Sequence, residues 1–244
     1  MAEFCMKIAG HTAKVVSLFE STPQYFRPYL CEDMPEFSVT VTRENIDFEQ
    51  ADLLAEAHRD GFRPRVFTDP FLERAAIQRA FAEFLIDHNT LLFHGSGISV
   101  DGEGFLFTAH SGTGKSTHTR LWRQVFGERA VMVNDDKPFL EIKSDGVWLH
   151  GSPWSGKHGL DSNICVPLKG LCILERGKEN TIRPATMEET LPMLKKQAYE
   201  PLAENAATAF LELVNALSEQ VPLWKLVCNK DPDAATVAWE AMHI

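Results

Sequence analysis

A glycine-rich segment between a predicted strand and a predicted helix constrains the fold of this chain more than any other feature. The segment 110–117 reads HSGTGKST, follows the apolar run 105–109 and precedes a helical pattern over 115–125. Small residues let successive backbone N–H groups point into one concavity, and the positive end of a helix dipole favours an anion there. The pattern therefore predicts a phosphate-binding loop in an α/β domain.

The residue types in this loop assign roles in binding a nucleoside triphosphate. The predicted binding residues are Ser111, Gly112, Thr113, Gly114, Lys115, Ser116 and Thr117. Lys115 would reach the β- and γ-phosphates of ATP, and the Ser116 hydroxyl would hold Mg²⁺. The strict pattern has glycine at position 109, where this chain has Ala109. Alanine fits there if its φ is negative and is strained if φ is positive.

Two adjacent aspartates follow the predicted strand 130–133, in the run Asn134-Asp135-Asp136. A carboxylate at the end of a core strand beside a phosphate loop is where Mg²⁺ is held in such proteins, which makes Asp135 a candidate metal ligand. Neighbouring side chains on an extended chain point in different directions. Asp136 is therefore a candidate base for the proton of an incoming hydroxyl. The alternative is a solvated turn.

Other candidates lie upstream and downstream of this centre. His94 ends a predicted strand and would donate to a phosphoryl oxygen or carry a proton; the alternative is a structural histidine. The loop 151–159 would close over a nucleotide base or an acceptor, with Trp154 stacking and Lys157 meeting charge, or else form an ordered surface turn. We interpret His118, on the helix after the phosphate loop, as a solvated residue.

Composition excludes several classes of protein. Apolar residues make up 44% of the 244 residues and charged residues 24%, which excludes a disordered chain. The net charge of −10 argues against a nucleic-acid or membrane-surface binder. No apolar run reaches the ~18 residues of a membrane span, and the N-terminus lacks a leader pattern, so we expect a cytoplasmic protein. The five cysteines form no C-x-x-C pair, which predicts reduced and mostly buried thiols.

Periodicity divides the chain near residue 89. Residues 1–89 are predicted to form an N-terminal α+β region, with a turn at Gly10–His11, and residues 90–244 a strand-rich core. The spacing of Thr186 and Glu189 predicts a capping box, and Pro192 predicts a kink or restart in the helix that follows. The remaining predicted strands are 4–9, 14–20, 37–42, 90–94, 97–100, 139–143, 147–150, 168–175 and 221–228, and the remaining predicted helices are 47–59, 69–88, 202–219 and one opening at 231–232.

Together these residues resemble a known family. The run from His94 through the loop 111–116 to Asp136 is similar to the kinase domain of HPr kinase/phosphorylase, over residues 90–175. The Ser-Gly-Thr-Gly-Lys form also resembles the ATP-dependent phosphoenolpyruvate carboxykinases. The resemblance implies an α/β fold with a P-loop mixed sheet of that type and a small N-terminal α+β region. It implies an active site of His94, Lys115 and Asp136, Ser116 as a magnesium ligand, and Asp161 at the position of a second metal carboxylate.

The resemblance and the residues imply ATP-dependent, Mg²⁺-assisted phosphoryl transfer to a hydroxyl of an unidentified small-molecule, peptide or protein acceptor. The second-substrate loop and C-terminal arginine of the HPr kinases have no counterpart that we identify, so HPr itself is not assigned. An alternative is a catalytically degenerate, nucleotide-binding sensor or partner-binding module. Phosphate-dependent dephosphorylation at the same site is another. We expect no nucleic-acid or membrane partner, and the resemblance is compatible with a homo-oligomer.

Overall fold

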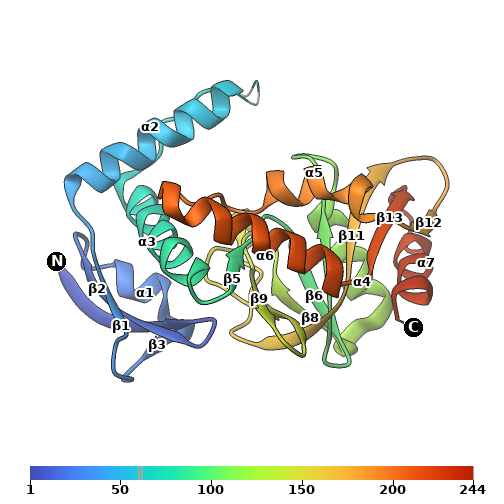
Figure 1. Cartoon of the computed structure of the whole chain (residues 1–244), viewed down its shortest axis with the longest axis horizontal. Coiled ribbons are helices and arrows are strands. Elements are labelled where there is room, and N and C mark those ends of the chain that lie inside the picture. The colour runs from blue at the N-terminus through green and yellow to red at the C-terminus, as the bar shows by residue number, and fades with distance from the viewer. Residues whose placement is uncertain (60, 62, 244) are drawn as a thin grey trace. The chain divides into compact units, whose positions relative to one another are not determined.

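The computed structural model describes residues 1–59, 61 and 63–243 of the chain (Figure 1). The chain divides into two compact units, Met1–Phe84 and Leu85–Ile244, and each unit combines helices with a β-sheet. The fold class is therefore α/β. All the site residues predicted from the sequence lie in the second unit.

The first unit contains, in its described residues, a four-stranded sheet of order β3-β1-β2-β4. A two-residue turn joins β1 to β2, and both of its residues, Ala9 and Gly10, have the positive φ that a tight hairpin requires. The turn lies one residue earlier than predicted, because His11 already pairs with Ile8. The elements of this unit are β1 (Ala2–Ile8), β2 (His11–Ser17), α1 (Thr22–Tyr25), η1 (Arg27–Tyr29), β3 (Leu30–Cys31), β4 (Phe37–Thr40), α2 (Arg43–Arg59) and α3 (Asp69–Ile86), which ends just inside the second unit.

The second unit is built on a mixed sheet that has nine strands within the described residues. Its order is β5-β9-β10-β11-β7-β6-β8, with β13 paired to β11 and β12 paired to β13. Strands β7 and β13 both run parallel to β11, which lies between them. The elements are β5 (Thr90–Leu92), β6 (Ser96–Val100), β7 (Glu103–Thr108), α4 (Lys115–Phe126), η2 (Gly127–Arg129), β8 (Ala130–Asn134), β9 (Phe139–Lys143), β10 (Gly146–His150), η3 (Gly156–His158), β11 (Cys165–Arg176), β12 (Thr181–Pro184), α5 (Met187–Gln197), η4 (Glu204–Ala206), α6 (Ala207–Gln220), β13 (Leu223–Cys228) and α7 (Asp233–Met242).

Successive residues of the central strands belong to two different helical layers. In β7, Phe105 and Phe107 pack in a core with α4 and α7, whereas Leu106 packs in a core with α5 and α6. Strand β11 repeats this division, with Cys172 in the first core and Leu171 in the second. Because successive side chains of a strand project to opposite faces, the sheet is covered by helices on both faces. This burial explains the continuous apolar runs of the central strands.

Strand direction brings the predicted site residues to one edge of the sheet. Strand β6 is antiparallel to both β7 and β8, so β7 and β8 run in the same direction. The loop after β7, the residues after β8 and the residues before β6 therefore meet at the same edge. Strand β11 is parallel to β7 and also ends there. Ligands of open α/β sheets bind at this carboxyl edge.

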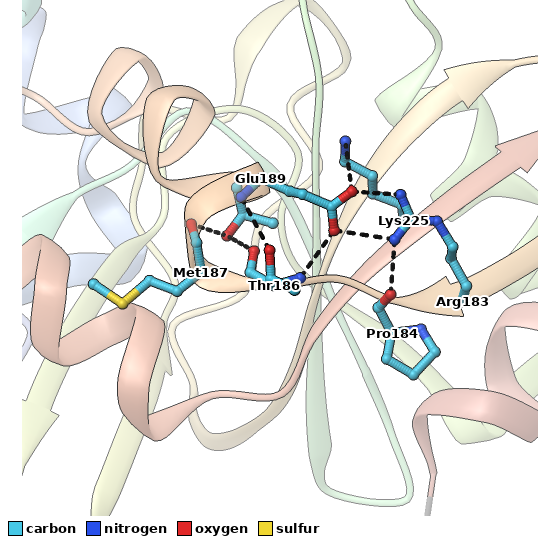
Figure 2. Close-up of polar contacts among 7 residues, drawn as sticks. Arg183, Pro184, Thr186, Met187, Glu189 and Lys225 are labelled. Atoms are coloured by element: carbon cyan, nitrogen blue, oxygen red, sulfur yellow. Dashed lines mark hydrogen bonds and ion pairs between the residues drawn. The ribbon is translucent and has the colours of Figure 1, made fainter.

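A capping box begins α5, as the sequence predicts (Figure 2). Thr186 Oγ1 accepts a hydrogen bond from the Glu189 amide (3.3 Å), and the Glu189 carboxylate accepts one from the Thr186 amide (3.0 Å). Hydrogen bonds from Arg183 and Thr186 lower the pKa of Glu189 to about 2. No restart occurs at Pro192, because α5 is unbroken. The proline removes one backbone donor, but the capping box and the fully buried Leu194 hold the helix.

Two expectations from composition concern thiols and membranes. The five cysteines are free, as expected, but they are not mostly buried: Cys172 is buried, Cys165 is exposed, and the other three are intermediate. None of the helices in the described part of the chain has the length and apolarity that crossing a bilayer requires.

Strand β12 is not among the predicted elements, since Ile182 is the single aliphatic residue among its four.

Candidate functional site

The glycine-rich loop joins the buried strand β7 to the first turn of α4. Gly112 (φ +77°) and Gly114 (φ +130°) adopt backbone conformations that side-chain-bearing residues rarely adopt, so the loop requires glycine at both positions. Gly114 is the N-cap of α4 and offers no side chain to the first-turn amides. The amides of residues 114–117 thus form the positive end of the helix, where partial positive charge favours an anion.

Ala109 fits the position where the strict pattern has glycine. Its φ is not positive, and its side chain is fully buried in the core shared by β7, α4 and α7. The methyl group therefore contributes to packing without backbone strain, and the departure from the pattern does not distort the loop.

Lys115 places a buried cation beneath the loop. Its side chain is 9% exposed, and Nζ donates to the Ala109 carbonyl at 3.4 Å. Burial lowers the pKa of the Lys115 ammonium, and the carboxylates of Asp136 and Asp135 oppose this shift. Among the described residues Lys115 has no direct ion-pair partner, so the ammonium is available to an anion that enters the loop.

Asn134 fixes the turn that carries the two aspartates. Its side chain is fully buried at the end of β8. Asn134 Oδ1 accepts hydrogen bonds from the amides of Asp136 (2.7 Å) and Lys137 (2.6 Å), and Nδ2 donates to the Ser152 carbonyl (2.7 Å). An asparagine that bonds the backbone two residues on is a well-known turn former. The same side chain thus sets the turn and joins it to the loop after β10.

The two aspartates have different partners. Asp135 is 6% exposed and accepts a hydrogen bond from Ser96 Oγ (2.6 Å), and Ser96 Oγ also bonds Thr119 Oγ1 on α4 (2.8 Å). Asp136 is half-buried and lies 3.3 Å from His94 Nε2. Asp135 is thereby connected to the helix after the loop, and Asp136 to the histidine before β6. In the described part of the chain the Ser116 hydroxyl and the Asp135 carboxylate form no hydrogen bond with each other.

His94 lies two residues beyond the end of β5, in a segment held by backbone contacts. The strand ends at Leu92, whereas the sequence predicts an end at His94. The His94 amide donates to the Gln197 carbonyl (2.7 Å), and the His94 carbonyl accepts from Thr108 Oγ1 (3.0 Å). The next amide, Gly95, donates to the Asp136 carbonyl (3.0 Å). These contacts fix the histidine beside Asp136.

Burial and neighbouring charges set the protonation of this pair. Burial lowers the pKa of His94, the hydrogen bond to Asp136 partly opposes it, and the cations Lys137 and Lys115 lower it further. Burial alone would raise the pKa of Asp136, but the His94 hydrogen bond and the charges of Lys137, His94 and Lys115 together lower it. The lowered pKa of His94 favours a neutral imidazole at neutral pH, and the lowered pKa of Asp136 favours an ionised carboxylate beside it.

The loop 151–159 lies directly against Asp136. A Cβ atom added to Gly156 would lie 3.1 Å from the Asp136 Cβ, and Gly156 has φ +69°. Ser155 Oγ donates to Asp161 Oδ1 (2.5 Å), and Asp161 forms a backbone bridge with Asn134, so the loop is restrained at Ser155. Trp154 is 7% exposed and packs edge-on against Phe139, so the expectation that it stacks on a nucleotide base is wrong.

Arg176 contacts the glycine-rich loop and is absent from the site predicted from sequence. It is the last residue of β11, and its Nε donates to the Thr113 carbonyl at 3.1 Å. Its Nη2 donates to the Gly112 carbonyl. The available signal was its position at the end of a predicted strand, but the parallel pairing of β11 with β7 is not readable from periodicity.

His118 is buried rather than solvated. It is 2% exposed, its ring packs against Phe107, and its Nε2 accepts a hydrogen bond from Trp122 Nε1 (3.0 Å). Burial lowers its pKa to about 3. The helical spacing of His118 and Trp122, four residues apart, is the sequence signal that could have placed both on the buried face of α4.

This histidine predicts a loss of stability in mild acid. Below the unfolded pKa of about 6.5 the unfolded chain binds a proton that folded His118 does not, so stability rises with pH between about 3 and 6.5. From pH 6.5 to 5 the group should remove about 2 kcal/mol of unfolding free energy. Denaturant unfolding at both pH values measures this. His118→Gln should reduce the slope of unfolding free energy against pH by the equivalent of about one proton. The control His158→Gln, at an exposed position, should leave this slope unchanged. Equal slopes in the wild-type protein and both variants would contradict the assignment.

Comparison with known proteins gives likeness in structure alone. No family model matches the chain, and no curated protein matches it. Among solved structures, the chain is similar to the HPr(Ser) kinase/phosphatase from Coxiella burnetii, with a TM-score of 0.30 and 13% sequence identity. The match covers 51% of this chain and 93% of that chain. A likeness of this size assigns no activity or site to the chain.

Proposed function

We propose that the second unit is a P-loop kinase of the HPr kinase and phosphoenolpyruvate carboxykinase fold type, which transfers the terminal phosphoryl group of ATP to a hydroxyl. One observation carries the proposal. The loop between β7 and α4, with Gly112 and Gly114 at positive φ, lies at the same sheet edge as the paired His94 and Asp136. An anion cradle beside an ionised carboxylate is the arrangement that phosphoryl transfer to a hydroxyl requires.

In this proposal the loop and Lys115 bind the polyphosphate. The amides of residues 114–117 and the Lys115 ammonium face the phosphate oxygens, while the amides of residues 111–113 complete the loop. The Thr113 amide has an internal role, because it donates to the His110 carbonyl (3.1 Å) and closes the turn. Preorganised donors of this kind stabilise the charge that develops on the leaving diphosphate.

Asp136 is the base of the proposed reaction. The acceptor oxygen forms a bond to the terminal phosphorus while the bond from that phosphorus to the bridging oxygen breaks and leaves ADP. The acceptor proton passes to the Asp136 carboxylate. His94 donates to the same carboxylate, which orients it and keeps it ionised before the transfer. The loop 151–159, packed on Asp136 through Gly156, borders the space for the acceptor.

A magnesium ion fits the donor set of this edge. The Ser116 hydroxyl and the Asp135 carboxylate are hard oxygen ligands, which Mg²⁺ prefers. Asp135 is held by Ser96, so its orientation is fixed independently of an ion. When bound, Mg²⁺ would neutralise charge on the β- and γ-phosphate oxygens. Ser116 and Asp135 are the residues that would hold it.

ATP turnover and ATP binding, measured together, test the proposal. We expect calorimetry to detect ATP binding in the presence of Mg²⁺, and a panel of hydroxyl compounds and peptides to raise ADP release. ATP binding without transfer to any acceptor would favour the nucleotide-binding sensor instead. Formation of pyrophosphate and free acceptor from a phosphorylated acceptor and inorganic phosphate would reveal the phosphate-dependent dephosphorylation. Absence of heat with both ATP and GTP would contradict the proposal.

A further inference from the structure

Strand β11 extends beyond β7 and runs beside the glycine-rich loop. The last residue pair between the two strands is Ile173 with Thr108, the final residue of β7. From there β7 turns into the loop, whereas β11 continues to Arg176 because β13 pairs with it up to Cys228. The register therefore places Arg176 level with the loop, on a strand that is fixed from its other side.

The Arg176 guanidinium binds two consecutive carbonyl groups of the loop. Nε donates to the Thr113 carbonyl (3.1 Å) and Nη2 to the Gly112 carbonyl. A trans peptide points its C=O and its N–H in opposite directions. Fixing the Thr113 carbonyl thus directs the Gly114 amide away from Arg176, and fixing the Gly112 carbonyl supports the Thr113 amide in its bond to His110.

The loop needs such a restraint because of its glycines. Gly112 and Gly114 flank Thr113, and glycine visits positive and negative φ with similar ease. The two peptide groups on either side of Thr113 can therefore rotate at low energy unless something holds them. A guanidinium that donates to both carbonyls holds both peptide groups. Arg176 itself is exposed.

We infer that Arg176, at the end of β11, is a positioning residue. It fixes the phosphate-binding conformation of the loop by hydrogen-bonding the Gly112 and Thr113 carbonyls. This inference rests on the proposed function, in that the loop it positions is the one proposed to bind ATP. Arg176 acts through the backbone amides and does not touch the substrate. Its shape matters as well as its charge, because an ammonium cannot span two carbonyls in a fixed geometry.

Calorimetry with ATP and with pyrophosphate, together with steady-state turnover, tests this role. We expect Arg176→Ala to weaken both ligands and to raise the KM for ATP about tenfold or more, since charged hydrogen bonds are lost, with a much smaller change in kcat. Arg176→Lys should recover only part of the affinity. Arg183→Ala is the matched control, because exposed Arg183 also donates to a backbone carbonyl, that of Pro184 (Figure 2), on a strand that pairs with β13 and not with β7 or β11. Full recovery by Arg176→Lys, or unchanged affinity in Arg176→Ala, would overturn the inference.

A second measurement separates this inference from the proposed function. In the nucleotide-free protein, the backbone amide signals of Gly112 and Gly114 in ¹⁵N NMR should broaden or shift in Arg176→Ala and stay unchanged in Arg183→Ala. Unchanged loop signals in Arg176→Ala would overturn the positioning role whether or not the protein binds ATP. If the loop signals respond but the wild-type protein binds no nucleotide, the proposed function fails and the positioning role stands.

Discussion

An Asp136→Asn variant is expected to bind ATP with near wild-type affinity and to transfer the phosphoryl group about 10²–10⁴-fold more slowly. Asparagine has the shape of aspartate and can still accept the hydrogen bond from His94, but it cannot take the acceptor proton. The loss is large because the wild-type carboxylate is ionised. Burial would raise its pKa, yet the His94 hydrogen bond and the cations Lys137 and Lys115 outweigh burial.

Calorimetry for ATP affinity and single-turnover kinetics for transfer separate binding from chemistry in this variant. The lowered pKa of Asp136 adds a pH signature, because the wild-type base stays ionised until the pH falls below the ordinary range of an aspartate. Asp145→Asn, in the exposed turn between β9 and β10, is the matched control and should retain both properties. Transfer at the wild-type rate by Asp136→Asn would assign the base to another group.

The glycine-rich loop, the strand before it and the helix after it could be predicted because their signals are local. The apolar run of Phe105, Leu106 and Phe107, the glycines at 112 and 114 and the helical pattern after Lys115 all lie within about two dozen residues. Each of these signals is local: a short apolar run for a buried strand, positive φ for glycine and period 3.6 for a helix. The structure contains these elements within a residue or two of their expected bounds.

Contacts that depend on strand order could not be predicted in the same way. Ser96 reaches Asp135 across 39 residues of sequence, and Arg176 reaches Thr113 across 63. Both contacts require knowing that β6 lies between β7 and β8, and that β11 lies on the other side of β7. Periodicity identifies strands but does not give their neighbours, so these partners become visible only in the folded sheet.

Side-chain burial in loops was the other source of error. Trp154 lies in a segment rich in glycine and serine, which is typical of an exposed turn, yet the ring is buried against Phe139. The reason is Asn134, whose buried amide donates to the Ser152 carbonyl and draws the loop against the end of β8. A polar residue at a strand end thus decides the position of an aromatic ring twenty residues later. Composition of the loop does not encode that link.

Replacing Lys115 with alanine is expected to abolish nucleotide turnover, lowering it by about 10²–10³-fold or more. The Lys115 ammonium donates to the Ala109 carbonyl, directly before the loop. The charges of Asp136 and Asp135 act on it by raising its pKa against the effect of burial. Without it, no buried cation at this position balances the charge that develops on the leaving diphosphate. ADP release measures turnover, and calorimetry with ATP reports the accompanying loss of affinity. Lys178→Ala removes an exposed lysine outside the site and should leave both unchanged.

The stability of the same variant distinguishes a functional lysine from a structural one. Lys115 is buried and, among the described residues, has no direct ion-pair partner, so burial disfavours its charged form in the nucleotide-free protein. Removing a group of this kind should leave the melting temperature unchanged or raise it, as expected where a binding site opposes stability. A variant that turns over ATP at the wild-type rate would contradict the phosphate-loop assignment. A variant that loses turnover together with a large fall in melting temperature would instead make Lys115 a structural residue. A lysine whose role is to bind an anion is not expected to stabilise the anion-free fold.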